Sequence, residues 1–300
     1  MTQAVQDAPV VVGRSVRPSV LDYIVGFAKR SPTATIGLVL IGFFALLAIF
    51  APWLMPYDPV AVNVNEILQA PSAKHWFGTD NNGMDVLSRV IYGARYAFGI
   101  AVPAVFLGLT IGVPIGLYTG YRGGLIDEVV MRVMDALRVF PSIILSLAVV
   151  AAAGPSLFNV VVVIGVLDAA LFVRIVRAEV LALRSSNFVE SGVALGNPLW
   201  RILFIHLLPN AIQGAMAQSA VRGAWAVRIS ATLAFLGIGI QPPTPEWGAM
   251  IRVGAESIVN GQWWVGIFPG VALILMVLGL NMLGDGLQDL LDPRRKSGAR

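Results

Sequence analysis

The sequence has no cysteine, and it has only two histidines and three lysines. Without cysteine there can be no disulfide and no thiolate metal site, and the lone histidines fall in different predicted loops. None of the three lysines, Lys29, Lys74 and Lys296, follows a glycine, so the Gly-Lys-Ser/Thr core of an ATP-binding P-loop is absent. Motifs for serine or zinc hydrolases are missing too. We therefore expect no enzymatic activity, no cofactor and no metal site.

Charge is also scarce: 13% of the residues are charged and 57% are hydrophobic, whereas soluble domains carry about 25% charged residues. Charge-free runs cover residues 36–53, 96–118, 139–167 and 262–283. Each run reaches the roughly 20 residues that a membrane-spanning helix needs. The first is too long for the core of a cleaved signal peptide, so it is interpreted as a retained span. These features predict an all-α membrane protein.

The apolar pattern predicts six transmembrane helices at about 35–55, 96–119, 134–153, 157–176, 211–236 and 262–284. The uncharged run from 139 to 167 is too long for one span, and Gly154-Pro155 supplies a tight turn within it. The fifth predicted span is unusual because Arg222 and Arg228 interrupt it.

Basic residues predict the orientation, since Lys and Arg accumulate in cytoplasmic loops. With the N-terminus inside, fifteen basic residues fall on the cytoplasmic side, and four fall outside: Lys74, Arg89, Arg95 and Arg252. Both termini and the loop at 177–209 are thus predicted to be cytoplasmic. The net charge of +4 reflects this topology, and we expect no binding to nucleic acid.

The predicted organisation has four parts. They are a cytoplasmic N-terminal segment (1–34), the first span with an outer loop (35–95), a core membrane region (96–290) that includes the cytoplasmic loop at 177–209, and a cytoplasmic tail (291–300). In the outer loop, Asp80 is predicted to cap a helix. Apolar residues follow at helical spacing: Met84, Leu87, Val90, Ile91 and Ala94. They predict a surface helix at the membrane interface, with a landing surface for an external partner as the alternative.

The segment after residue 187 predicts a compact helix-turn-helix between two apolar runs. Asn187 and Glu190 have capping-box spacing, Gly196 suits the left-handed turn that ends a helix, and Pro198 suits the first turn of the next. The second helix is expected to end at Leu208-Pro209, where the fifth span begins. Several apolar side chains offer a surface for a partner or for the membrane edge: Leu195, Leu199, Trp200, Leu203 and Phe204. The alternative is an ordinary loop that packs on its own protein.

Three charges lie within predicted spans: Asp168, Arg222 and Arg228. Such groups normally face a bundle interior or a watery cavity. The two arginines are six residues apart and do not share a helix face. One alternative is an Asp–Arg pair that joins the fourth and fifth spans. A second is an arginine that lines a pathway and binds a carboxylate there, and a third is snorkelling to an interface.

A series of ordered motifs carries a resemblance to a known family. The motifs include Ala51-Pro-Trp-Leu-Met-Pro-Tyr-Asp58, His75-Trp-Phe-Gly-Thr-Asp80, Phe140-Pro-Ser142, Gln241-Pro-Pro-Thr-Pro-Glu-Trp-Gly248 and Gly284-Asp-Gly-Leu-Gln-Asp289. They resemble the second (DppC/OppC-like) permease subunit of ABC importers for dipeptides, oligopeptides and nickel. The segment from Glu190 resembles the EAA loop of these permeases, with Glu190-Ser-Gly in place of Glu-Ala-Ala.

The resemblance implies a six-helix, type I importer-like permease that forms half of a translocation pathway in the bacterial inner membrane. The implied partners are a homologous second permease, two ATP-hydrolysing subunits, an extracytoplasmic binding protein, a peptide and the lipid bilayer. Residues of the EAA loop are implied to contact the ATPase: Glu190, Ser191, Gly192, Leu195, Gly196, Asn197, Pro198, Trp200, Arg201, His206 and Pro209. The alternatives are a permease for nickel, haem or glutathione, and, from another class, a structural subunit of a membrane enzyme complex.

Overall fold

The computed structural model describes residues 31–291, and all regular elements within this range are helical. The helices are α2 (Pro32–Leu54), η1 (Val64–Glu66), α3 (Val86–Arg122), α4 (Gly124–Val139), α5 (Ser142–Ala153), α6 (Leu157–Leu183), α7 (Asn187–Ala194), α8 (Leu199–Arg201), the π-helical η2 (Ile202–Leu207), α9 (Leu208–Phe235), α10 (Trp247–Ile258) and α11 (Trp264–Leu291). The predicted N-terminal segment and tail lie almost wholly outside the described residues.

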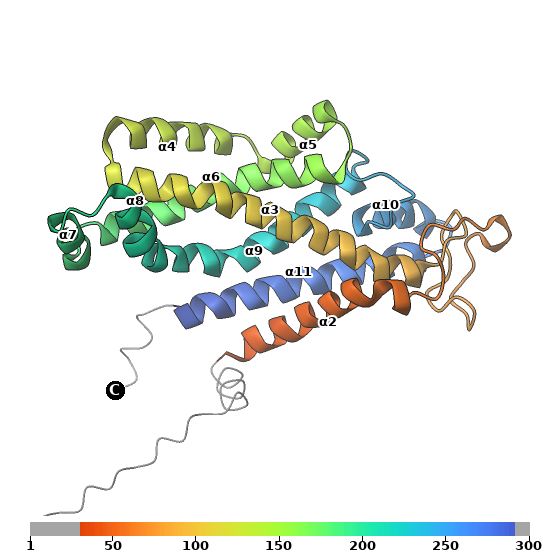
Figure 1. The fold of residues 1–300 in the computed structure, drawn as a ribbon. Helices are drawn as coiled ribbons and strands as arrows, with labels where there is room; N and C mark the ends of the chain where they lie inside the picture. The colour runs from red at the N-terminus through yellow and green to blue at the C-terminus, as the bar shows by residue number, and fades with distance from the viewer. Residues whose placement is uncertain (1–30, 292–300) are drawn as a thin grey trace, which may run out of the picture.

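The long helices run side by side and give the molecule two distinct ends (Figure 1). One end, which we call the α7 end, carries residues 183–207, the start of α4 and the end of α11. The opposite end, the α10 end, carries the loop at 55–85 together with α10. The loop at 55–85 and the segment at 183–207 therefore lie at opposite ends of the bundle.

Four described helices are long and apolar enough to cross a membrane: α2, α3, α6 and the α11 segment up to Asp289. The predicted third span, 134–153, is instead two helices, α4 and α5, bent by 87° at residues 140–141, and the pair counts as a fifth candidate. Pro141 explains the break because proline disfavours helical backbone in the residue before it. The predicted turn between 153 and 157 is confirmed.

The fifth predicted span corresponds to α9, which has 28 residues but does not meet the apolarity of the other spans. Its arginines and its polar residues near the start, such as Asn210 and Gln213, lower its mean hydropathy. Twelve of its residues are buried, so the bundle covers much of it. The fold is therefore an all-helical membrane protein with four or five clear candidate spans in the described chain.

The predicted interfacial helix was wrong: its residues form the first turns of α3, which begins at Val86 and continues without a break to Arg122. The cap is Asp85, whose Oδ2 accepts from the Ser88 backbone N–H at 2.8 Å. Asp80 instead accepts from the backbone of Asn82 and Met84 inside the loop. The boundary placed between residues 95 and 96 thus falls within one helix, because α10 and the 55–85 loop cover the apolar face of its first turns.

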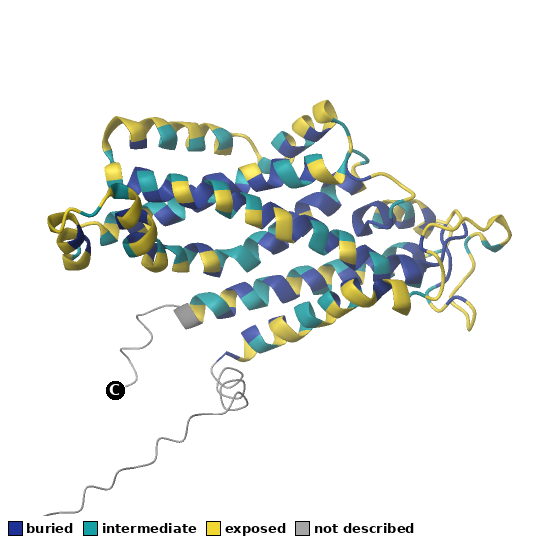
Figure 2. Cartoon of the chain, in the orientation of Figure 1, coloured by how far each residue is buried: buried dark blue, intermediate teal, exposed yellow. Residues whose placement is uncertain are grey.

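Glycines make the contact between α3 and α6 unusually close. Gly108, Gly112, Gly116 and Gly120 recur every fourth residue along the α6-facing side of α3. A Cβ added at Gly112 would lie 2.8 Å from the Ala169 carbonyl oxygen, so only glycine fits at this separation. Small residues at such spacing let membrane helices associate through backbone contact. This contact forms the stiff centre of the bundle, and Figure 2 shows both helices largely buried while α4 and α7 are exposed.

The α10 end is fastened by contacts between distant parts of the chain. The Trp247 indole donates to the Val90 carbonyl oxygen and the Trp264 indole to that of Thr79, each at 3.1 Å. Buried Arg89 donates from Nη1 to the carbonyl oxygens of Pro59 and Pro243, at 2.8 and 3.1 Å. These bonds hold the loop, α3, α10 and α11 together.

Candidate functional site

The element at the α7 end starts directly after α6, with three residues between the two helices. The predicted cap by Asn187 was wrong: Asn187 is already helical, Ser186 holds the N-cap position, and no side chain caps the helix. The Ser186 hydroxyl donates instead to the Leu183 carbonyl oxygen, at 2.5 Å, which ties α7 to the end of α6. Glu190 lies exposed in the first turn, where a carboxylate interacts favourably with the helix dipole.

The turn after α7 is a Schellman motif, and the left-handed position predicted for Gly196 is confirmed, with φ +72°. The Gly196 N–H donates to the Val193 carbonyl oxygen and the Asn197 N–H to that of Gly192, at 2.9 and 3.1 Å. Both bonds close the helix end with backbone alone, so the turn is short and stiff. Pro198 follows as the N-cap of α8, one position before the predicted one.

The second helix does not end at Pro209 as predicted; helical backbone runs from Leu199 through η2 into α9. The six residues of η2 adopt π-helical geometry just before Pro209. A proline ring clashes with the carbonyl four residues earlier in a regular helix, and a wider π turn relieves that clash. Consequently α7 connects rigidly to α6 on one side, and α8–η2 connects to α9 on the other.

One face of this element packs on the bundle. Val189 of α7 and three residues of η2, namely Ile202, Leu203 and Leu207, are buried with side chains of α3 and α6. Leu203 was predicted to offer surface, but it lies in this core. His206 is half-buried, and its Nε2 is buried without a hydrogen-bond partner in the described chain. The His206 ring lies against α7 at Gly192, where an added Cβ would be 3.7 Å from the imidazole.

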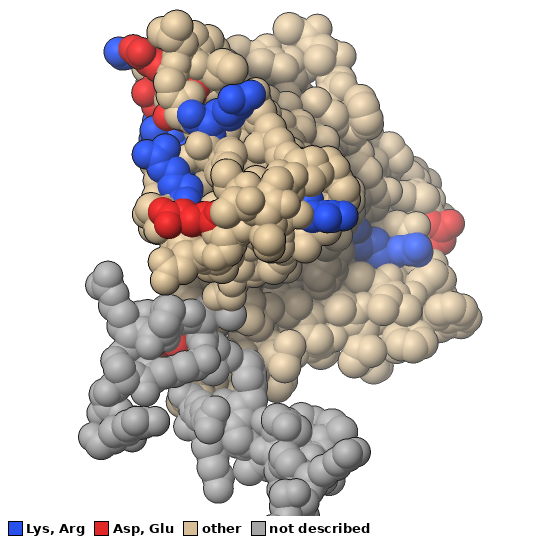
Figure 3. Space-filling view, turned by 60° about the vertical axis from the view of Figure 1, so that its left-hand side comes forward, with Lys and Arg blue, Asp and Glu red and all other residues tan. Residues whose placement is uncertain are grey.

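The opposite face exposes large apolar side chains. Leu195 is 82% exposed at the turn, Trp200 is 55% exposed just beyond it, and Phe204 is also exposed. Arg201 donates to the Asn197 side chain at 3.2 Å and lies 5.6 Å from the Trp200 ring centroid. Figure 3 shows basic side chains gathered towards this end, next to wide uncharged surface. Three arginines in or beside the segments that form this end are exposed: Arg122, Arg184 and Arg201. Exposed apolar groups with a polar rim are typical of a protein interaction site.

The intramembrane charges form an ion pair in the centre of the bundle. The Arg222 Nε donates to Asp168 Oδ1 at 2.6 Å, and Nη2 contacts the same oxygen. The Asp168 side chain is 0% exposed, and a Cβ at Gly108 of α3 would lie 2.9 Å from its Cβ. The predicted Asp–Arg pair between the fourth and fifth spans is thus confirmed. Arg228 is exposed and has no ion-pair partner among residues 31–291.

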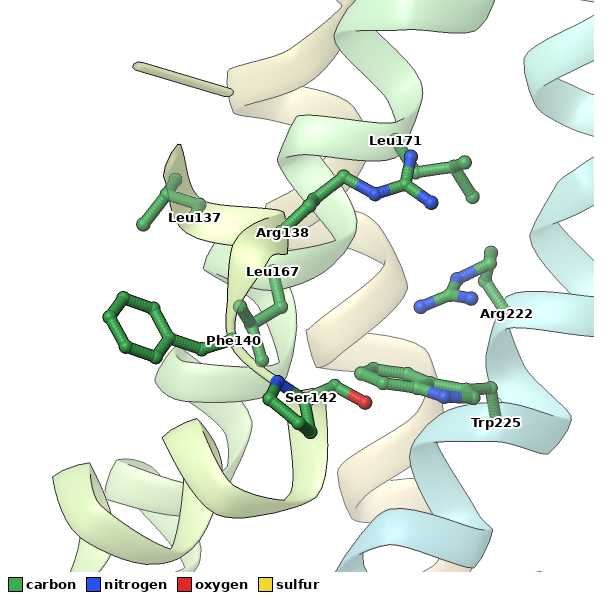
Figure 4. A pocket seen from close by; sticks show the side chains of 9 residues that line it. Leu137, Arg138, Phe140, Ser142, Leu167, Leu171, Arg222 and Trp225 are labelled. Carbon is green, nitrogen blue, oxygen red and sulfur yellow. The ribbon is translucent and has the colours of Figure 1, made fainter. Parts of the chain in front are cut away.

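A cavity of about 290 Å³ opens beside Arg222, between the α4–α5 elbow, α6 and α9 (Figure 4). It is lined by two arginines, Arg138 and Arg222, by Ser142, and by apolar groups: Leu137, Phe140, Pro141, Leu167, Leu171 and Trp225. The Arg222 guanidinium lies 4.0 Å from the Trp225 ring centroid. Sequence reasoning counted Arg138 among cytoplasmic charges and missed its place at this cavity. The sequence signal for this position is Pro141, three residues after Arg138, because a proline inside an apolar run indicates a break in the helix.

Comparison with known proteins supplies the family. The description "Binding-protein-dependent transport system inner membrane component" matches residues 112–297, and "N-terminal TM domain of oligopeptide transport permease C" matches residues 28–71. The chain belongs to this family of binding-protein-dependent inner-membrane permeases. It is a multi-pass protein of the bacterial inner membrane and a subunit of an ABC transporter.

Three relatives illustrate the similarity. A dipeptide transport system permease protein DppC of Alkalihalophilus pseudofirmus is 42% identical, over 90% of this chain and 88% of the relative. A probable D,D-dipeptide transport system permease protein DdpC of Escherichia coli is 37% identical, over 90% and 91%. A glutathione transport system permease protein GsiD of Pectobacterium atrosepticum is 37% identical, over 96% of both chains.

Proposed function

We propose that this chain is the permease subunit of an ATP-driven importer of di- or oligopeptides and forms half of its translocation pathway. The names of the dipeptide permease relatives support the substrate class, because their identity extends over about nine-tenths of both chains. Glutathione is itself a tripeptide, and the relatives named for it make it the second candidate substrate. Nothing in the described chain favours nickel or haem over these.

We further propose that the chain crosses the membrane six times with both termini in the cytoplasm. In this topology α9 is the additional span, and α4–α5 is one broken span. At 28 residues α9 is long enough, since each helical residue adds about 1.5 Å and the apolar layer is about 30 Å thick. Of its two arginines, Arg222 lies within the bundle, where Asp168 neutralises it, and Arg228 is exposed. The α7 end is then cytoplasmic and the α10 end external.

The partners follow from the family and from the two ends. A homologous permease completes the pathway, two ATPase subunits supply energy, and an external binding protein delivers the peptide. The α7 element is proposed to dock the ATPase through Glu190, Leu195, Gly196 and Trp200, with neighbouring contacts from Ser191, Asn197, Pro198 and Arg201. Gly192, His206 and Pro209 shape the element from within. No catalytic group or cofactor is assigned to this chain.

The single observation that carries the coupling role is the Schellman turn at Gly196 with exposed Leu195 at its tip. ATP-driven closure of the ATPase pair would push this tip. Since α7 continues from α6 and η2 continues into α9, the push reaches both sides of the Asp168–Arg222 pair. Rigid-body movement between two packed states is a common way for such a push to switch a pathway.

The function is tested by peptide uptake. A strain lacking only this chain should lose uptake of labelled di- and tripeptides and regain it with the wild-type gene. Gly196→Val should insert normally but restore less than about a tenth of that uptake, because a β-branched residue is strained at positive φ and misaligns the two helices. Gly42→Val on α2, where no atom lies within 4 Å of an added Cβ, is the matched control and should transport normally. Full uptake by Gly196→Val contradicts the coupling role.

The orientation is tested by thiol labelling, which the absence of cysteine makes clean. Single cysteines at the exposed positions Ser185 and Asn82 lie at the α7 and α10 ends. A membrane-impermeant reagent should label only Asn82→Cys in spheroplasts and should label both after lysis. Labelling of Ser185→Cys alone in intact spheroplasts reverses the topology.

A further inference from the structure

The elbow cavity has the chemistry of an anion site. Arg138 and Arg222 both line it, and no acidic side chain does. Arg222 already shares one oxygen of Asp168, so its charge is largely neutralised. Arg138 makes no ion pair or hydrogen bond with any residue between 31 and 291, which leaves its charge uncompensated. Figure 4 shows the guanidinium groups of both arginines on the same side of the elbow.

The place of the cavity in the bundle is equally informative. Asp168 and Arg222 lie near the middle of α6 and α9, so the cavity is at mid-depth in the bundle and not at either end. It is built on a discontinuous helix, since α4 and α5 meet there at 87°. The first turn of α5 has no side-chain cap, and Pro141 and Ser142 at that turn line the cavity. Transporters commonly place substrate sites at such mid-membrane breaks, with helix N-termini directed at anionic groups.

Size and wall chemistry restrict the ligand. A cavity of about 290 Å³ is at the lower end of small-molecule sites and accommodates one end of a peptide, not a whole chain. Of the two ends of a peptide, only the carboxylate suits a pair of guanidinium groups, which bind carboxylates through paired hydrogen bonds. Leu167, Leu171 and Trp225 supply apolar walls for the side chain of the last residue.

We propose that this cavity binds the free C-terminal carboxylate of the transported peptide, with Arg138 as the principal charge partner and Arg222 as a second donor held in place by Asp168. The proposal rests on the function proposed above and names the part of the substrate that the pathway recognises. It also gives Arg138, an exposed residue near the end of α4, a role in substrate binding.

The first experiment places a photoreactive group at the cavity. Leu171→benzoylphenylalanine is introduced into the chain, and the purified transporter complex, without binding protein, is irradiated with three labelled probes. The probes are alanyl-phenylalanine, its C-terminal amide and its N-acetyl derivative. The free acid and the N-acetyl peptide should label this chain, and the amide should label it about ten-fold less, as expected for loss of a charge-assisted hydrogen bond. Equal labelling by the amide overturns the proposal.

The second experiment removes the charge. Arg138→Gln should reduce labelling by the free acid to the level of the amide, and Arg138→Lys should restore part of it. Arg132→Gln is the matched control, since Arg132 is an exposed arginine on the same helix. Its only ion pair within residues 31–291 is the surface contact with Glu128 at 3.9 Å. Arg138→Gln leaves Arg222 and its ion pair with Asp168 unchanged, so folding is not at issue. Wild-type labelling by Arg138→Gln overturns the proposal.

Uptake by cells separates this proposal from the proposed function. If wild-type cells take up peptides but no probe labels position 171, the carboxylate site is wrong and the peptide permease stands. If cells take up no peptide yet labelling still requires the carboxylate and Arg138, the cavity is a carboxylate site and the substrate class is wrong. With both intact, Arg138→Gln should lower the maximal uptake rate about ten-fold while the half-saturating peptide concentration, set by the binding protein, changes less than two-fold.

Discussion

The two ends of the molecule are stabilised by different kinds of contact. At the α10 end, tryptophan and arginine side chains donate to carbonyl oxygens of distant segments, and Phe77 stacks on Phe268 with ring centroids 3.9 Å apart. At the α7 end, backbone bonds within one turn close the helix, and the large side chains beyond it point outwards. The first end is stabilised by the chain itself, whereas the second leaves apolar surface that a partner has to cover.

Glycine has a different structural role at each of the two ends. Gly248 at the α10 end is a packing residue, since an added Cβ would lie 2.1 Å from the Ala231 carbonyl oxygen. Gly196 at the α7 end has no atom within 4 Å, and only its backbone angle requires glycine. A close approach fixes where two helices lie, but a positive φ fixes only the direction in which the chain turns. The α7 end can therefore be stiff without being tightly packed.

The largest effect on folding is expected between the two ends, at the Asp168–Arg222 pair. Arg222→Met leaves Asp168 buried without a partner, which destabilises a protein by about 3–5 kcal/mol. The folded yield in membranes, measured by size-exclusion chromatography of a fluorescent fusion, should fall strongly. Asp168→Asn in the same chain should restore part of that yield. If Arg222→Met alone folds as well as wild type, the pair is not needed to hold α9 against α6.

A smaller loss of stability is expected from two matched glycine substitutions, one at each end of the molecule. Gly248→Ala forces α10 away from α9 and should destabilise the protein by about 2–3 kcal/mol, as overpacking does. Gly196→Ala meets no atom and should lower stability by about 1 kcal/mol through backbone strain alone. Thermal unfolding in detergent measures both. The distinction between the ends fails if Gly196→Ala is the more damaging of the two.

The smallest effect is a dependence on pH at the α10 end. Glu246 caps α10 through its bond from the Ala249 N–H at 2.9 Å, and burial raises its pKa from 4.5 to about 7. The folded state then keeps a proton that the unfolded state has already lost between these pH values. Stability should therefore fall as pH rises from 4.5 through 7 and level off above it.

Glu246→Gln removes this titration while keeping a hydrogen-bond acceptor for the cap. Unfolding temperatures measured from pH 5 to pH 8 should thus drop less steeply for Glu246→Gln than for wild type. Parallel curves for the two proteins would mean that Glu246 does not carry the dependence.

The sequence predicted correctly those features that depend on one residue or its immediate neighbours, and it predicted poorly those that depend on distant parts of the chain. The turn at Gly154-Pro155 and the left-handed Gly196 follow from preferences of single residues, and both are confirmed. The Asp168–Arg222 pair followed from the high energy of unpaired charge in lipid and is confirmed as well. In contrast, Met84 to Ala94 showed helical spacing, but spacing cannot tell whether such a helix ends or continues, and α3 continues.

The remaining errors concern contacts that only the assembled bundle creates. Leu203 faces the core because η2 widens the helix before Pro209, a deviation that no periodicity reveals. Arg138 lines the same cavity as Arg222 because α4 folds back along α6. Two ion pairs join these helices: Arg177 donates to Asp127 at 2.5 and 2.6 Å, and Arg174 pairs with Asp135. These pairs join residues about 40 to 50 positions apart, so the sequence offered no spacing from which to predict them.

Photocrosslinking from matched positions at the two ends tests the central claim most directly, namely that the α7 end receives the ATPase. Single cysteines replace Leu195, which is 82% exposed, and Val64, which is 71% exposed at the α10 end, and each carries a benzophenone maleimide in the intact transporter. We expect Leu195→Cys to capture an ATPase subunit, with a yield that changes on addition of ATP, and Val64→Cys to capture none. Capture of the ATPase from position 64, or its absence at position 195 while the complex stays intact, would contradict the account.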